Sequence, residues 1–139
     1  MDQSLPTEII SLEDRACALD DSPPVSPSQP SKFVIIASPQ QISLVFGPIA
    51  EFPYHANLVK RFCDINKIPS GWLKKPDVYE IYGDSHEVRG GGWMEVAGEN
   101  GELKIYGYST TYGSFKRKDI LYLYHSQIGS GDIELSFDS

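Results

Sequence analysis

Two apolar runs separated by a short polar segment constrain the fold more than any other feature of the sequence. Phe33–Ala37 is apolar throughout, and Ile42–Phe46 is apolar except for Ser43. A strand built only from apolar residues is typical of a sheet that is buried on both faces. Pro39 and the two glutamines after it predict a turn between the runs. We therefore expect two paired, buried strands.

Further along the chain, the patterns predict both helices and strands. Pro53–Ile65 has apolar residues at helical spacing, and Pro53 suits the first turn of a helix. Alternating apolar residues and turn signals, among them the Asn-Gly pair at 100–101, predict four more strands at 77–82, 86–96, 103–108 and 133–137 and a helix from Asp119 to about Ser126. Six strands and two helices predict one α/β (α+β) domain, in which the helices pack on a mixed sheet of about six strands.

The composition changes near residue 31. Residues 1–31 hold six of the 19 acidic residues, one base and five of the ten prolines. Such a segment buries too little apolar surface to offset its loss of conformational entropy, so we expect a disordered acidic tail before a folded domain at 32–139. Within the tail, residues 5–19 place apolar residues roughly on one helical face. This favours a marginal helix, with a docking segment as the alternative.

Charge and cysteine content exclude several classes of function. The net charge is −7, and a net acidic chain is a poor ligand for nucleic acid or anionic membranes. No apolar run approaches the roughly 18–20 residues of a membrane span. The two cysteines, Cys17 and Cys63, form neither a disulfide framework nor a CxxC motif, so we expect a reducing, cytoplasmic setting and no zinc site. No cofactor is expected.

His55 is the first candidate for chemistry. It follows Pro53 in the first turn of the predicted helix and flanks the apolar stripe rather than lying in it. The partial positive charge of a helix N-terminus disfavours the imidazolium form, so the ring is expected to be neutral and able to accept a proton. The free N–H groups of the same turn can bind an anion. The alternative is a capping or surface histidine.

Three other features are candidates for phosphate binding or for close packing. Ser109, Thr110 and Thr111 follow a predicted strand between two glycines, which favours an anion-binding loop, with an ordinary Ser/Thr turn as the alternative. Lys32 precedes the first strand and can bring a positive charge to a phosphate at the sheet edge. Gly90–Gly92 lacks the dinucleotide-binding pattern and predicts a bulge or a tightly packed strand.

The remaining polar residues have simpler interpretations. A hydrolase triad of Ser109, His55 and Asp64 is disfavoured, because Ser109 lacks the surrounding GxSxG motif. His86 and His125 have no metal-ligating partner at suitable spacing, so we expect both to be structural or exposed. The basic triplet at 116–118 is interpreted as a solvated face, with selection of an acidic partner as the alternative.

Four segments together resemble the Janus/Ocnus family, whose best-known members are 14 kDa phosphohistidine phosphatases. The matching segments are Lys32–Ile36, Tyr54–Asn57, Gly90–Gly92 and Tyr106–Gly113, and the resemblance covers about 32–137. It implies a monomeric α/β domain that hydrolyses phosphohistidine on proteins without a metal. It also implies that His55 is the catalytic histidine, that Lys32 binds substrate, and that Ser109, Thr110 and Thr111 bind the phosphate.

The sequence departs from the family pattern at two arginines. Vertebrate members carry an arginine directly after the triple glycine, where this chain has Trp93, and another shortly before the YHA segment, where it has Phe46–Pro48. Loss of two guanidinium groups weakens phosphate binding or changes the substrate. The alternative function is therefore a phosphate-recognition or protein-interaction module of the same fold with little or no turnover.

Overall fold

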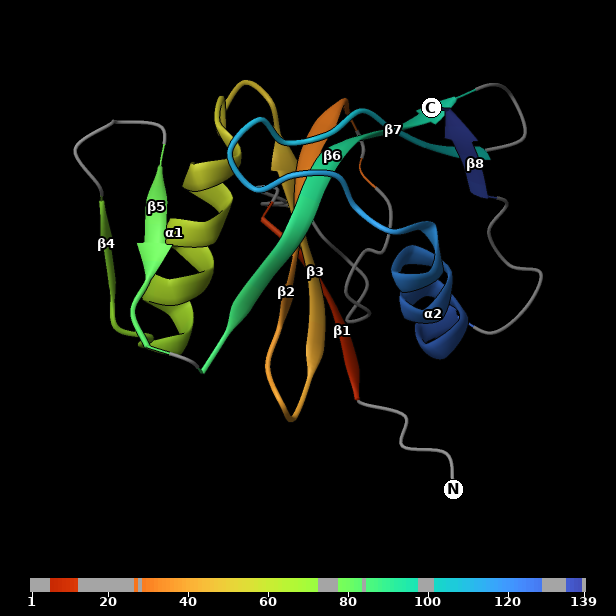
Figure 1. The fold of residues 1–139 in the computed structure, drawn as a ribbon. Coiled ribbons are helices and arrows are strands. Elements are labelled where there is room, and N and C mark those ends of the chain that lie inside the picture. Colours follow the sequence, from red (N-terminus) through yellow and green to blue (C-terminus); the bar gives the residue numbers. More distant parts are fainter. Residues whose placement is uncertain are drawn as a thin grey trace, which may run out of the picture.

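A six-stranded mixed sheet runs through the molecule and carries one helix on each face (Figure 1). The computed structural model describes residues 6–12, 27, 29–72, 78–83, 85–97, 102–128 and 135–138. The strand order is β1 (Thr7–Ser11), β3 (Ile42–Pro48), β2 (Ser31–Ala37), β6 (Glu87–Ala97), β7 (Glu102–Tyr106) and β8 (Leu135–Asp138). The two outer pairs, β1 with β3 and β7 with β8, are parallel, whereas the inner strands are antiparallel. The predicted class, a mixed sheet with two helices, is confirmed.

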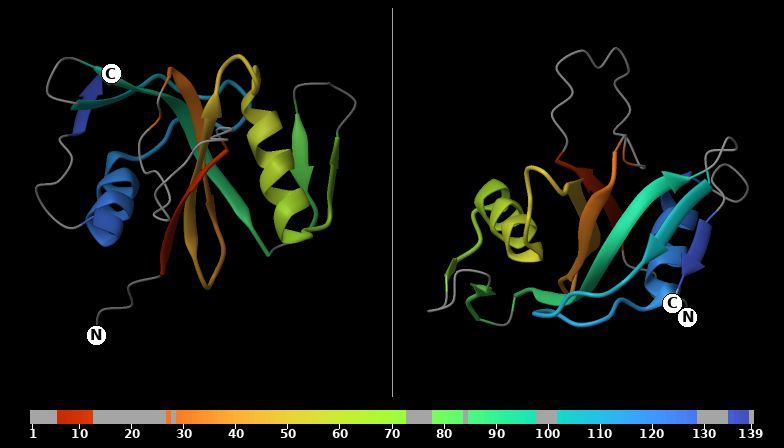
Figure 2. Two further views of the ribbon diagram at one scale, coloured as in Figure 1. Left: turned by 180° about the vertical axis from the view of Figure 1, so that it is seen from behind. Right: turned by 90° about the horizontal axis from the view of Figure 1, so that it is seen from above.

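The helices lie on opposite faces of this sheet, as the view from above shows (Figure 2). Helix α1 (His55–Asn66) covers one face, and α2 (Arg117–Ile128) covers the other. A smaller antiparallel sheet of β4 (Ser70–Trp72) and β5 (Tyr79–Ile81) lies beside α1.

The two apolar runs are continuous because both faces of their strands are buried. Phe33 and Ile35 belong to the core under α2, which includes Ile120 and Leu123. Val34, next to them in β2, belongs to the second core under α1. Successive side chains of a strand point to opposite faces, so a strand between two helices needs apolar residues at every position. The predicted pairing of these runs is confirmed by the antiparallel register that joins Phe33 to Phe46.

The N-terminal segment differs from the prediction. Residues Thr7–Ser11 form β1, which pairs in parallel with β3, and Ile9 is buried in the core under α2. The predicted helix over 5–19 and the predicted disorder of the whole segment 1–31 are therefore wrong for Thr7–Ser11. The backbone of β1 forms its hydrogen bonds with β3, which lies more than 30 residues further along the chain. No local sequence pattern reveals such a pairing. Residues 1–5, 13–26 and 28 of this segment lie outside the described residues.

Other elements match the prediction with local differences. Helix α1 begins after Tyr54, whose N–H donates to Asn57 Oδ1 at 2.9 Å, and ends at Lys67 in the left-handed conformation. The strand expected at 77–82 is β5, which belongs to the small sheet rather than the main one. Asp119, expected as the cap of the second helix, lies inside its first turn. The predicted Asn-Gly turn at 100–101 lies outside the described residues.

Among the residues that the structure describes, no helix is long and apolar enough to cross a membrane.

Candidate functional site

The start of α1, the start of β2, the middle of β6 and the loop after β7 line one pocket. Its volume is about 240 Å³, and it is lined by Lys32, Tyr54, His55, Trp93, Tyr108, Thr110 and Thr111. Four of the five predicted site residues therefore meet in one place, although they come from three distant parts of the chain. Three aromatic residues complete the lining.

His55 is the first residue of α1 and the most enclosed polar residue of the pocket. Its side chain is only 7% exposed, so the prediction that it flanks the apolar stripe is wrong. Its Nε2 lies 3.0 Å from the carbonyl oxygen of Gly92, and its ring forms a T-shaped pair with Trp93, with the two ring centroids 5.3 Å apart. Because a carbonyl oxygen only accepts, Nε2 carries the hydrogen of the neutral ring. Nδ1 is then the unprotonated nitrogen, and it makes no hydrogen bond with the described residues.

The neutral state of His55 has a cause that the sequence did not reveal. Burial of the ring is the largest effect, and it lowers the pKa of His55 below 6.5. The hydrogen bond to the Gly92 carbonyl raises this pKa in part, and the positive charge of Lys32 lowers it further. Sequence reasoning predicted a neutral ring from the helix dipole, whereas desolvation is the main source.

The glycine tract explains how a strand passes so close to this ring. A Cβ on Gly91 would lie 2.4 Å from the carbonyl oxygen of Phe33 and 3.0 Å from Cδ2 of His55. The register between β2 and β6 also shifts by one residue beside the tract, between Val34 and Ile36. The predicted bulge and the predicted close packing are therefore both present. Without side chains at these positions, β6 can cover His55 and offer it the Gly92 carbonyl.

Lys32 extends from β2 along two aromatic rings. Its ammonium donates a hydrogen bond to the carbonyl oxygen of Pro53, and it lies 5.9 Å from the ring centroid of Tyr54 and 5.5 Å from that of Trp93. Partial burial lowers the pKa of Lys32 from its usual value. An ammonium has three donors, so two remain for a ligand in the pocket. This side chain brings the positive charge that the sequence predicted.

In the loop that carries Ser109, Thr110 and Thr111, one hydroxyl residue stabilises the loop and the other two line the pocket. Ser109 and Gly113 exchange two backbone hydrogen bonds of 3.1 and 2.8 Å, and Ser109 Oγ accepts the N–H of Tyr112 at 3.0 Å. Ser109 is 1% exposed and is not among the lining residues. It closes the loop, while Thr110 and Thr111 face the pocket. The predicted triplet therefore contributes two side chains rather than three.

Tyr112 ties the same loop to the small sheet. Its phenolic oxygen donates to the carbonyl of Tyr79 at 2.6 Å and accepts the N–H of Tyr79 at 3.1 Å. One side chain thus satisfies both backbone groups of a β5 residue, as a neighbouring strand would. This contact joins the loop to β5.

Sequence reasoning missed the aromatic lining. Tyr54 and Tyr108 belong to the family motifs but were assigned no role, and Trp93 was considered only as the position of a missing arginine. One signal was available: Gly91 and Trp93 are two residues apart in a strand and therefore lie on one face. In the structure, Trp93 pairs in register with Lys32 on one side and with Tyr106 on the other.

The disfavoured alternatives remain apart from the pocket. Asp64 forms an ion pair of 2.7 Å with Lys60 on the exposed side of α1, so it does not complete a triad with Ser109. The ring of His86 packs against that of Phe62, with the two ring centroids 5.9 Å apart, and His125 is exposed on α2. Within the described part of the chain, no group of three or more potential metal ligands comes together.

Comparison with known proteins identifies a family. The sequence model of the Janus/Ocnus family matches residues 31–129, which is most of the chain and includes every residue of the pocket. No curated protein matches the chain. The segment with β1 and the last strand, β8, lie outside the matched region.

Proposed function

The chain belongs to the Janus/Ocnus family, and on this premise we propose that it hydrolyses the P–N bond of phosphohistidine in proteins without a metal ion. The observation that carries the proposal is the contact of 3.0 Å between Nε2 of His55 and the Gly92 carbonyl oxygen. Because Nε2 donates to that carbonyl, Nδ1 is left as a base at a pocket that also holds an ammonium group. The partners of such an enzyme are proteins that carry phosphohistidine.

In the proposed reaction, the pocket binds the phosphoryl group by its oxygens. The Lys32 ammonium offers two donors and a positive charge, and Thr110 and Thr111 line the same space. Charge neutralisation and positioning provide most of the rate in phosphoryl transfer, because the transition state is loose and its charge lies on the phosphoryl oxygens.

His55 moves the proton. A water molecule attacks phosphorus while Nδ1 of His55 accepts its proton, and the bond from phosphorus to the imidazole nitrogen of the substrate breaks. The departing nitrogen then takes the proton from His55, so the products are inorganic phosphate and histidine. A base with a pKa below 6.5 is unprotonated at pH 7, which suits the first of these steps.

Phosphate release from a phosphohistidine peptide tests the proposal. We expect His55→Gln to lower the rate by about a hundredfold or more, since general base catalysis typically contributes 10²–10⁴-fold. Glutamine can still donate to the Gly92 carbonyl, so we expect the fold to be preserved. His125→Ala, a change of an exposed histidine on α2, is the matched control and should release phosphate at the original rate. Unchanged release by His55→Gln would contradict the proposal.

The recognition module remains the second candidate, and Trp93 is the observation that favours it. An indole occupies the place of a family arginine, so Lys32 is the one cationic side chain among the lining residues. A pocket with less positive charge can still bind a phosphoryl group while stabilising the transition state poorly. Binding of the phosphopeptide without release of phosphate would favour this function.

A further inference from the structure

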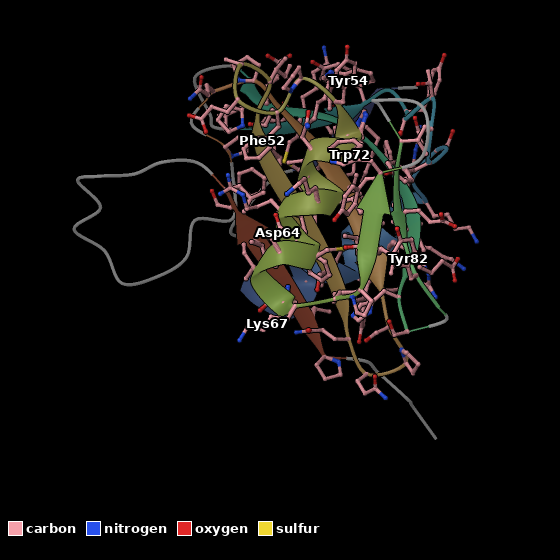
Figure 3. All side chains as sticks on the ribbon, turned by 90° about the vertical axis from the view of Figure 1, so that its left-hand side faces the viewer. Phe52, Tyr54, Asp64, Lys67, Trp72 and Tyr82 are labelled. Atoms are coloured by element: carbon pink, nitrogen blue, oxygen red, sulfur yellow. The ribbon has the colours of Figure 1, made fainter. Side chains whose placement is uncertain are left out.

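Three aromatic side chains surround the pocket, and we refer to Tyr54, Trp93 and Tyr108 as the aromatic rim. The tyrosines are strongly exposed for large rings, Tyr54 by 52% and Tyr108 by 55%. They come from separate segments, the residue before α1 and the loop after β7. In Figure 3, Tyr54 lies at the start of α1, and Lys67 lies at the other end of the same helix. Exposed apolar surface that gathers at a pocket indicates a ligand.

Trp93 is the fixed member of the rim. The Lys32 ammonium lies over its ring, and the ring of Tyr106 stacks against it with an interplanar angle of 15° and a centroid distance of 6.3 Å. A Cβ on Gly107 would lie 2.3 Å from the indole, and Gly107 has a φ of +77°. The indole is therefore held between its neighbours, and it holds Lys32 in turn. The tyrosine rings keep more of their surface open to a ligand.

The rim and Lys32 offer two kinds of recognition side by side. The ammonium attracts phosphoryl oxygens, and aromatic rings within one pocket attract the face or edge of another planar ring. An imidazole attached to the phosphoryl group presents such a ring, whereas the amine of a phosphorylated lysine continues into a flexible alkyl chain without one.

We propose that the aromatic rim selects phosphoryl groups carried on a planar azole ring over those carried on an alkyl amine. Tyr54 and Tyr108 contact the ring, and Trp93 keeps Lys32 at the phosphoryl oxygens. This inference rests on the proposed function for its phosphoryl ligand. It assigns the choice of substrate to the rim and leaves the chemistry to His55.

Binding of two stable peptides to the full chain tests the inference without turnover. One peptide carries a phosphonate on a triazole ring, and the other carries a phosphonate on a butyl chain in the same sequence. We expect the full chain to bind the triazole peptide about tenfold more tightly, because the two tyrosine rings can pack against the triazole ring but find no such ring on the butyl chain. Calorimetric titration of each peptide measures this ratio.

Variants assign the ratio to the rim. Tyr54→Leu combined with Tyr108→Leu should bring the ratio close to one, while Tyr108→Phe alone should keep it, because the ring remains. Tyr82→Leu is the matched control, since Tyr82 is 51% exposed on the β4–β5 side and does not line the pocket. Far-UV circular dichroism of each variant checks that the fold is intact.

The outcomes separate this inference from the proposed function. Equal affinity of the full chain for both peptides, or no binding of either, would overturn the inference, and so would a ratio that survives the double substitution. A ratio that depends on the rim supports it. If that ratio is found but phosphohistidine releases no phosphate, the proposed hydrolysis fails while the preference for an azole stands.

Discussion

Both helices begin beside a pocket with basic side chains, yet the two regions differ in one respect. The pocket at α1 combines Lys32 with a neutral histidine, and the first turn of α1 has no acidic residue. The pocket at α2 has a volume of about 340 Å³ and is lined by Glu87, Arg89, Lys116, Lys118 and Asp119. Its cations face two carboxylates, one of them in the first turn of the helix.

From this comparison we expect an anion at the α1 pocket and not at the α2 pocket, although both have basic residues near a helix start. Positive charge attracts a ligand only where no local carboxylate neutralises it, and Asp119 at α2 already occupies the favourable position at the helix dipole. The basic triplet, the strongest cluster of positive charge in the sequence, is exposed at all three positions. Its interpretation as a solvated face agrees with this exposure.

Substitution of one lysine in each region is the sharpest test of this difference. We expect Lys32→Met to raise the KM for a phosphohistidine peptide by about tenfold to a hundredfold, because a hydrogen bond to a charged group contributes about 1.5–3 kcal/mol. Lys118→Met, at the start of α2, should leave KM within about twofold. Steady-state phosphate release measures both, and equal effects of the two substitutions would remove the distinction between the regions.

The pH dependence of the rate tests the buried histidine against an exposed one. Burial lowers the pKa of His55 below 6.5, so the base remains unprotonated from neutral pH down to that lowered value. We expect the rate to be constant near pH 7 and to fall about tenfold per pH unit below the pKa, with its midpoint under pH 6.5. Spontaneous hydrolysis is subtracted at each pH. A midpoint at or above 6.5 would indicate a solvated ring.

The same pKa difference predicts a change in stability. The unfolded chain binds a proton at His55 near pH 6.5, whereas the folded chain resists it until a lower pH. The contribution of the neutral ring is therefore complete above pH 6.5 and declines as the pH falls toward the folded pKa. We expect Tm to decrease more between pH 7.5 and 5.5 for the original chain than for His55→Gln.

The sequence predicted the features of the α1 pocket that depend on local patterns, and it missed those that depend on contacts between distant segments. The paired apolar runs and the first helix follow from local patterns. The motifs predicted one site for Lys32, His55, Thr110 and Thr111, and these residues line one pocket. Burial of His55 was not predicted, because it depends on β6 crossing α1 at the glycine tract. Nor was the inward turn of Ser109, whose partner, the amide of Tyr112, is fixed by the loop conformation.

The N-terminal strand shows the same limit for the fold. Ile9 and Ile10 are the only adjacent apolar pair of β1, and they stand among acidic and polar residues. Their stability comes from the parallel edge of β3, which no nearby residue signals. The local composition predicted a tail, because it gives no information about β3, the distant strand with which this segment pairs.

Tyr112 connects the loop of the α1 pocket to β5 through a tyrosine hydroxyl. The described residues that line the α2 pocket include no tyrosine. Tyr112→Phe removes the hydroxyl that serves both the N–H and the carbonyl of Tyr79. We expect the free energy of unfolding to fall by about 1–3 kcal/mol, and KM to rise a few-fold because Thr110 and Thr111 lose their support. Tyr82→Phe, at an exposed ring, is the control for both measurements. A loss of stability with unchanged KM would mean that the pocket loop holds its position without this contact.

The smallest expected effect lies at α2, where Asp119 is 8% exposed and its Oδ2 has no hydrogen-bond partner in the described structure. Two opposing effects act on this carboxylate: burial without a partner is unfavourable, whereas the helix N-terminus and the nearby cations stabilise its charge. We expect the second effect to dominate, so that Asp119→Asn lowers the free energy of unfolding by about 0.3–1 kcal/mol while phosphate release is unchanged. Urea denaturation measures the first quantity. A more stable variant would show that burial prevails, and a change in phosphate release would show that the two helix starts are coupled.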